Sequence, residues 1–290
     1  MKTNTKIFLA KAIYFFLSFL LKKKQYIIKR NNINWKLDLS EGIDLSLFLF
    51  GSFQKEIIHS MTKLIYKKNY KNSINIIDIG SNIGDKSLSL AQELLSNNIK
   101  KFKIYSVEPT DFAYRKQIAN LRLNPNLKKK ISVFKKFIST KKKLPKSTYS
   151  SWSLKSIDNR HKIHGGVLRD IDSRTEILTL DKFIKENQIK NQIILKIDVD
   201  GFEMEVLKSL IDNIKKNNPI IFMEYAPYAL EGHGTSIKFF HKFLKKNKYE
   251  VFDLNFKKLD VIKISQGSSV DIVLKKKKLK IFLFNFSSKI

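Results

Sequence analysis

Four acidic residues lie at the carboxyl ends of segments that read as buried β-strands. The expected strands comprise residues 74–79, 102–107, 193–197 and 219–223, and the acids at their ends are Asp78, Glu108, Asp198 and Glu224. The carboxyl ends of parallel strands share one edge of a sheet, and ligands bind just outside that edge. One such carboxylate is often a helix cap, but four at the same edge predict a ligand site.

The first of these strands leads into a glycine-bearing turn, IIDIGSNIGDKSLSLAQ, at residues 76–92. Turns of this kind can hold a nucleoside triphosphate, a dinucleotide or S-adenosylmethionine. A triphosphate loop needs GxxxxGK[ST], and no glycine precedes Gly84 at that spacing. A dinucleotide turn needs a glycine where Asn82 stands, because the pyrophosphate comes close to the backbone there. Both of these ligands are therefore disfavoured.

S-adenosylmethionine carries no phosphate, and its polar groups match the residues present. A carboxylate near the turn, such as Asp78, favours the ammonium group, while Gly80 and Gly84 allow close approach of the backbone. A carboxylate after the second strand, such as Glu108, can accept hydrogen bonds from both ribose hydroxyls. The pair of motifs DxGxNxG and VEP therefore predicts an S-adenosylmethionine site.

Five segments, taken in order, resemble the FkbM family of S-adenosylmethionine-dependent methyltransferases. They are DIGSNIG, VEPT with a downstream Asn (Asn120 or Asn124), TLDKF, LKIDVDGFEMEVLKSL and IIFMEYAP. The resemblance covers roughly residues 50–249. It implies a class I methyltransferase fold, S-adenosylmethionine as cofactor, and methylation of a hydroxyl group, often on a sugar or a secondary metabolite.

The resemblance also assigns residues to the cofactor by their place in the motifs. The residues expected to bind it are Asp78, Gly80, Ser81, Asn82, Gly84 and Glu108. The family segment K-[IV]-D-[VI]-E-G reads KIDVDG here, with Asp200 in place of the usual glutamate. The substitution keeps the negative charge but shortens the reach of the side chain.

Methyl transfer to a hydroxyl needs a base near the strand ends that accepts the hydroxyl proton. Asp198 is the first candidate by position, and its alternative role is that of a structural carboxylate. His233 is the second candidate, because it lies between glycines after the strand that ends at Glu224. His161 and His164 are weaker candidates, and their spacing provides no third ligand for a metal, so no metal site is expected.

Strands and helices alternate from residue 74 onward, which predicts an α/β fold with a mostly parallel sheet and helices on both faces. Residues 1–53 are expected to form an N-terminal helix followed by an irregular extension, and residues 54–290 the methyltransferase domain. A further strand, the third in chain order, is expected at 131–138, and a single helix is expected at 203–216. The insert at about 145–174, with Tyr149 and Trp152 among polar residues, is interpreted as a cap over the acceptor.

The chain of 290 residues carries 56 Lys and Arg against 26 Asp and Glu, a net charge of +30. Such an excess suits a phosphate-rich partner, but all except six of these cations are lysine, whereas nucleic-acid readers favour arginine. Frequent Lys, Asn and Ile together also fit an AT-rich coding bias. An RNA methyltransferase remains an alternative, although Asp198-Val199-Asp200-Gly201 occupies the place where that class often has Asn/Asp-Pro-Pro-Tyr/Phe. Nucleic acid is therefore not the expected partner, and a small molecule or glycan is.

The N-terminal apolar run, IFLAKAIYFFLSFLL at residues 7–21, is interrupted by Lys11 and followed by Lys22, Lys23 and Lys24. It is shorter than the roughly 20 residues of a spanning helix, and it lacks the small-residue cleavage site of a secretory signal. We expect a helix that packs on the domain of a cytoplasmic protein, with peripheral membrane contact through residues 7–24 as the alternative. A non-catalytic membrane-binding protein on the same scaffold is the third functional class, and the intact Asp78, Gly80 and Glu108 disfavour it.

Overall fold

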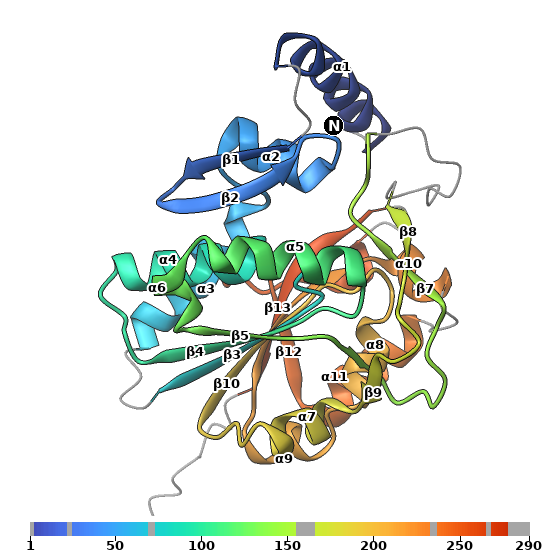
Figure 1. Ribbon diagram of the computed structural model, residues 1–290. Helices are drawn as coiled ribbons and strands as arrows, with labels where there is room; N and C mark the ends of the chain where they lie inside the picture. The colour runs from blue at the N-terminus through green and yellow to red at the C-terminus, as the bar shows by residue number, and fades with distance from the viewer. Residues whose placement is uncertain are drawn as a thin grey trace, which may run out of the picture.

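A computed structural model describes residues 3–21, 25–68, 73–154, 166–232, 237–264 and 268–277. Its centre is a seven-stranded sheet in the order β12-β13-β11-β10-β3-β4-β5 (Figure 1). The strands are β3 (Ile74–Ile79), β4 (Phe102–Val107), β5 (Ile131–Phe134), β10 (Gln192–Ile197), β11 (Ile220–Tyr225), β12 (Tyr249–Phe252) and β13 (Val270–Lys276). Strand β13 runs antiparallel to both of its neighbours, and the other pairings are parallel. The predicted mostly parallel sheet is confirmed.

Helices cover both faces of this sheet, because successive strand residues point to opposite sides. Ile74 and Ile76 belong to one core cluster and Ile77 and Ile79 to the other. Figure 1 shows the first layer above the sheet, with α3 (Lys55–Lys68), α4 (Asp85–Ser96), α5 (Asp111–Arg122) and α6 (Pro125–Lys128). The second layer has α7 (Leu180–Glu186), α8 (Glu203–Lys208), α9 (Asp212–Lys216) and α11 (Ile237–Asn247), with α10 (Pro227–Gly232) and η1 (Val261–Lys263) nearby.

Two expected elements are interrupted. The strand expected at 131–138 splits, because β6 (Lys136–Ile138) leaves the central sheet and pairs with β9 (Glu176–Leu178). The helix expected at 203–216 divides into α8 and α9. The Asp181 carboxylate, from a distant helix, accepts hydrogen bonds from the backbone N–H groups of Ile211 and Asp212, both at 2.7 Å. These bonds start a new helix, which local helical spacing does not reveal.

The extension expected to be irregular is instead folded into the core. Residues 25–38 form a hairpin of β1 (Gln25–Arg30) and β2 (Ile33–Asp38), and α2 (Gly42–Phe50) follows. Trp35 and Leu37 of β2 are fully buried, and they pack with α3 and α4. Asn120 and Asn124 of the first layer accept hydrogen bonds from backbone N–H groups of β2, at 2.8 and 2.9 Å.

The N-terminal helix α1 (Thr3–Leu21) lies at one end of the molecule, beyond the hairpin (Figure 1). Ala10, Tyr14, Leu17 and Leu21 pack on a small cluster that includes Leu45 of α2. The expected packing of this helix on the domain is thus observed. Within the described part of the chain, no helix is long and apolar enough to cross a membrane.

The burial of Trp35 yields a stability prediction. Replacing Trp35 with alanine should lower the free energy of unfolding by about 3–5 kcal/mol, because it removes the largest fully buried side chain of the first core layer. Chemical denaturation followed by circular dichroism measures the change. Phe50→Ala, at a position with 74% exposure, is the matched control and should change the free energy little. Equal stability of Trp35→Ala and the parent would show that the hairpin is not part of the cooperative core.

Candidate active site

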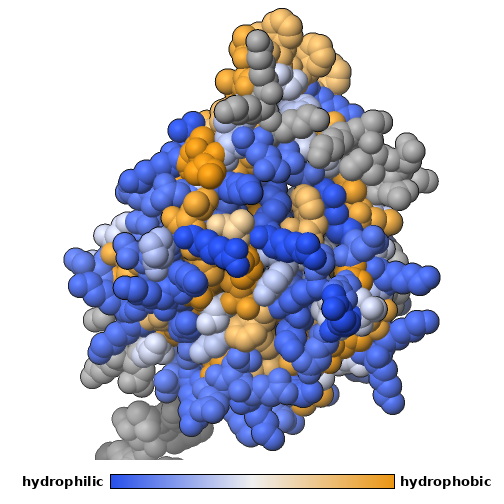
Figure 2. Space-filling view, in the orientation of Figure 1, coloured by the Kyte–Doolittle hydropathy of each residue, from blue (hydrophilic) through white to orange (hydrophobic). Residues whose placement is uncertain are grey.

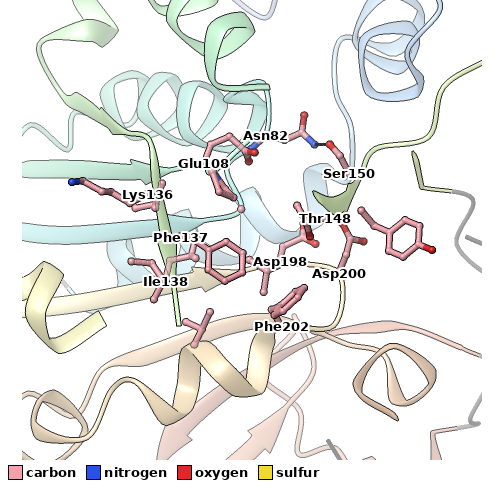
Figure 3. A pocket seen from close by; sticks show the side chains of 17 residues that line it. Asn82, Glu108, Lys136, Phe137, Ile138, Thr148, Ser150, Asp198, Asp200 and Phe202 are labelled. Carbon is pink, nitrogen blue, oxygen red and sulfur yellow. Dashed lines mark hydrogen bonds between the residues drawn. The ribbon is translucent and has the colours of Figure 1, made fainter. Parts of the chain in front are cut away.

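A cleft opens at the carboxyl ends of β3, β4 and β10, where the chain order reverses between β3 and β10. Its lining comes from the turn after β3, from the ends of β4 and β10, from β6 and from residues 148–150. Figure 3 shows Asn82 and Glu108 on one side, with Asp198, Asp200 and Phe202 across from them. The predicted edge of the sheet is therefore hollowed.

Two glycines set the shape of the turn after β3. Gly80 has φ of +77°, and a Cβ atom there would lie 1.8 Å from the carbonyl oxygen of Asp198. Gly84 has φ of +84°, and a Cβ atom there would lie 2.8 Å from Cγ of Gln117. Asn82 also has a left-handed backbone, with φ of +48°, which asparagine tolerates better than most residues. Side chains at either glycine would displace the turn from β10 or from α5.

Asp78 is buried below this turn rather than in the cleft. Its Oδ2 accepts a 2.6 Å hydrogen bond from Ser87, and its Oδ1 lies 3.2 Å from Nζ of Lys196. Ser81 and Gly84 are likewise buried, and Ser81 donates a hydrogen bond of 2.9 Å to Gln117. Among the residues described, these three do not line the cleft, so the geometry gives them the role of holding the turn.

Lys196 is a functional residue that the sequence reasoning missed. Its Nζ donates a 3.1 Å hydrogen bond to the carbonyl of Gly80 and lies 3.3 Å from Oδ2 of Asp198. Burial opposes the charge of Lys196, but the carboxylates of Asp78, Asp198 and Asp85 outweigh it and hold its pKa above the usual value. The sequence does contain a sign of this ion pair. Lys196 lies inside the apolar run IILKI, and a buried lysine needs a charged partner.

Glu108 lines the cleft with a carboxylate that is already oriented. Its Oε2 accepts a 3.0 Å hydrogen bond from the backbone N–H of Asn82. Its Oε1 accepts bonds from the backbone N–H and the hydroxyl of Thr110, at 3.0 and 2.5 Å. Burial raises the pKa of Glu108, and the bonds from Thr110 and Asn82 oppose that rise. Glu108 is therefore placed where its carboxylate could accept hydrogen bonds from the ribose hydroxyls of a bound nucleoside.

The remaining lining fits S-adenosylmethionine. Phe137, Ile138 and Phe202 form an apolar wall suited to an adenine ring, with the two aromatic rings 5.4 Å apart edge to face. The glycine turn lets a ligand reach the backbone. Oδ1 of Asn82 is buried without a hydrogen-bond partner among the described residues, which leaves an acceptor for a donor group of the ligand.

A second cavity, with about 810 Å³ of open space, adjoins the first. The two share Gly80, Asn82, Ser150, Asp198 and Asp200 as a common wall. The side chains that line the second cavity alone include two aromatic rings, one isoleucine and several polar or charged groups: Ile43, Phe53, Gln54, Asp85, Lys86, Ser151, Trp152, Lys196 and Glu224. The molecule thus has two adjoining compartments.

The N-terminal region and the predicted insert together cover the second cavity. The insert forms a hairpin of β7 (Ser147–Ser150) and β8 (Val167–Asp170). The ring of Trp152 packs on Gly42, and the Gly42 N–H donates a 2.9 Å hydrogen bond to the Trp152 carbonyl. Arg169 pairs with Glu41 at 2.8 Å. Ile43 and Phe53, which the sequence division placed outside the methyltransferase domain, therefore line this cavity.

Carboxylates crowd the wall between the cavities. Burial, followed by the charges of Asp198 and Glu203, raises the pKa of Asp200 to about 8. Burial also raises the pKa of Glu203 to about 7, although backbone N–H groups of Val199 and Gly201 donate to it. Within the described residues no group of three His, Asp or Glu side chains is arranged to hold a metal ion. The candidates His233, His161 and His164 lie outside the described residues.

The pKa of Asp200 predicts how stability varies with pH. The ordinary pKa is 3.8 and the folded value about 8, so the folded state retains a proton that the unfolded state loses. The stability that this proton contributes is present at low pH and lost as the pH rises through about 8. The melting temperature should therefore fall by a few degrees between pH 6 and pH 9, and Asp200→Asn should reduce that fall. The control Asp212→Asn, at an exposed position, should leave the fall in melting temperature unchanged. If the melting temperatures of the parent and of Asp200→Asn fell equally, the raised pKa of Asp200 would be contradicted.

The geometry of Glu108 predicts its effect on cofactor affinity. Glu108→Ala should weaken S-adenosylmethionine binding by roughly 10- to 100-fold, since it removes charge-assisted hydrogen bonds. Isothermal titration calorimetry measures this. The affinity of Glu108→Gln, which keeps one acceptor oxygen, should lie between the affinities of the parent and of Glu108→Ala. Glu186→Ala, at an exposed position away from the cleft, is the control. Unchanged affinity in Glu108→Ala would exclude the ribose contact.

Comparisons with known proteins identify the family of the chain. The model of the "Methyltransferase FkbM domain" family matches residues 78–251, which is more than half of the chain. No curated protein sequence matches the chain. A solved FkbM methyltransferase from Methylobacillus flagellatus KT aligns at 16% identity and TM-score 0.41, covering 70% of this chain and 43% of that one. This chain therefore spans less than half of the length of that protein.

Two further solved structures align over larger shares of both chains. Magnesium protoporphyrin IX methyltransferase from Synechocystis PCC 6803, with bound S-adenosylmethionine, shows 9% identity and TM-score 0.40, covering 77% of this chain and 79% of that one. A human methyltransferase 10 domain containing protein shows 12% identity and TM-score 0.42, covering 93% and 97%. The family match over residues 78–251 confirms the predicted family and its cofactor, S-adenosylmethionine: the chain belongs to the FkbM family of methyltransferases.

Proposed function

We propose that the protein transfers the methyl group of S-adenosylmethionine to a hydroxyl of a sugar, a glycan or a secondary metabolite, in the cytoplasm. The observation that carries this proposal is the common wall of the two cavities. A donor in the cleft beside Glu108 and an acceptor beside Trp152 would meet across Asp198 and Asp200. The two compartments provide the arrangement that a direct transfer between two bound molecules requires.

The residues of the common wall supply the chemistry around the transfer. When bound, S-adenosylmethionine supplies a methyl group on a sulfonium, which is already a good leaving group. The chain must orient the acceptor oxygen, keep water away and accept the hydroxyl proton. Asp198 lies on the wall between the compartments, and its Oδ2 lies 3.3 Å from Nζ of Lys196. We assign the proton to Asp198, with His233 as the second candidate.

The lining of the second cavity supports a neutral, hydroxyl-rich acceptor. Trp152 offers an aromatic face, and Gln54 and Ser151 offer hydrogen-bonding groups, a combination that suits carbohydrates. Lys86 is held between the Asp85 carboxylate at 2.6 Å and the Phe53 carbonyl at 2.9 Å, so its charge is already compensated. Among the described lining residues, an anionic acceptor would meet the Asp85 and Asp198 carboxylates, whereas both lysines of the lining, Lys86 and Lys196, are already paired with carboxylates. This acidic lining also disfavours a nucleic acid as acceptor.

The role of Asp198 is tested by the rate of methyl transfer. Asp198→Asn should lower the rate by about 10²–10⁴-fold, because general-base catalysis contributes about that much, while S-adenosylmethionine affinity changes little. Release of S-adenosylhomocysteine, measured with a panel of oligosaccharide and polyhydroxylated acceptors, gives the rate. Asp212→Asn is the matched control at an exposed position.

A parallel His233→Asn variant distinguishes the two candidate bases. A loss confined to His233→Asn would transfer the role of base to that residue. Full activity in both variants would show that neither side chain accepts the proton in the rate-limiting step.

A further inference from the structure

Helix α1 presents a continuous apolar surface to the outside of the molecule. Figure 2 shows it as a hydrophobic projection at the top of the view, where Figure 1 places α1. We call it the outer face of α1, and its residues, which are between 39% and 77% exposed, are Phe8, Leu9, Ile13, Phe15, Phe16, Phe19 and Leu20. Soluble monomers rarely expose so many large apolar side chains side by side, so this face is expected to have a partner.

The opposite side of the same helix is already occupied. Ala10, Tyr14, Leu17 and Leu21 follow one another at spacings of three and four residues and pack with Leu39, Leu45 and Leu154. Phe8, Phe15 and Phe19 lie on the other side of the helix at 100° per residue. The inner side of α1 therefore attaches the helix to the rest of the protein. The outer face of α1 does not contribute to that packing.

The charge around α1 identifies the kind of partner. No acidic residue precedes Asp38 in the sequence, whereas nine Lys and Arg do, against an overall ratio of 56 to 26. Lys11 of α1 and Lys29 and Arg30 of β1 are exposed. A second copy of the chain docked on this face would bring two such positive segments together, which is unfavourable. An anionic surface is complementary to them.

We propose that the outer face of α1 docks on an anionic lipid bilayer, with the phenylalanine side chains in the headgroup region and the helix axis parallel to the membrane. Apolar aromatic side chains on one face, with cations beside them, are the features of interfacial helices. Trp152 packs against the same small cluster as the inner side of α1 and lines the second cavity. Docking would therefore hold that cavity near the membrane surface. The inference does not depend on the proposed methyl-transfer chemistry.

Vesicle co-sedimentation of the full chain tests the proposal. The parent should pellet with vesicles of phosphatidylglycerol and phosphatidylcholine, at least about tenfold more than with phosphatidylcholine alone, and less at high salt. Phe15→Ser/Phe16→Ser/Phe19→Ser should lower that partitioning by about tenfold or more. The matched control Tyr66→Ser/Ile211→Ser/Ile262→Ser removes apolar side chains of 60–74% exposure elsewhere and should bind as the parent does. No binding of the parent to anionic vesicles, or equal loss in the control, would overturn the proposal.

A fluorescence reporter tests the same contact without removing it. Phe19→Trp should shift its emission to shorter wavelength when phosphatidylglycerol vesicles are added, whereas Tyr66→Trp should not. Light scattering distinguishes a second copy of the chain as the partner. If the parent is a dimer, the triple Phe→Ser variant a monomer and Phe19→Trp insensitive to vesicles, the outer face is a dimer interface and the membrane proposal is wrong.

Discussion

The buried ammonium group of Lys196 is the interaction on which the site depends. It lies between the carboxylates of Asp78 and Asp198 and donates a hydrogen bond to the carbonyl of Gly80. These groups come from β3, from the turn after it and from the end of β10, so one cation joins the two strands at which the chain order reverses. A buried charge is tolerated only with such compensation, and loss of one partner would leave the others unpaired. The glycine turn therefore has its shape, and Asp198 its position, before any ligand binds.

The N-terminal region is structurally inseparable from the catalytic half of the molecule. Its hairpin donates backbone hydrogen bonds to Asn120 and Asn124, and Trp35 completes the first core layer. Its α2 supports Trp152 through Gly42, while Glu41 pairs with Arg169 of the insert. Since Ser150 of the insert in turn accepts a hydrogen bond from the Asn82 side chain, the cover of the second cavity is connected directly to the cofactor turn. An acceptor that contacts this cover would therefore also touch the elements that hold the cofactor.

The protein separates its charges. The chain as a whole has an excess of lysine, whereas the second cavity is lined by Asp85, Asp198, Asp200 and Glu224. The net charge attracts anionic surfaces to the outside, and the carboxylates disfavour anions in the second cavity. The proposed membrane partner and the proposed acceptor would thus be selected by charges of opposite sign, so the overall charge of the chain is a poor guide to the acceptor.

The sequence by itself determined the alternating architecture, the glycine turn, the placement of Glu108 and Asp198 at one sheet edge, and the family. These features depend on periodicity and on residues close together in the chain, and local motifs carry that information. Only the tertiary structure decided the partners that are far apart in sequence. Asp78 is turned toward Lys196 instead of the cleft, and the Asp181 carboxylate caps the start of α9, about 30 residues away in the sequence. The folded hairpin at residues 25–38 and its share in the second cavity depend on contacts with α5 and the insert. Such contacts leave no periodic pattern, because each is a match of shape and charge between surfaces that only the folded chain brings together.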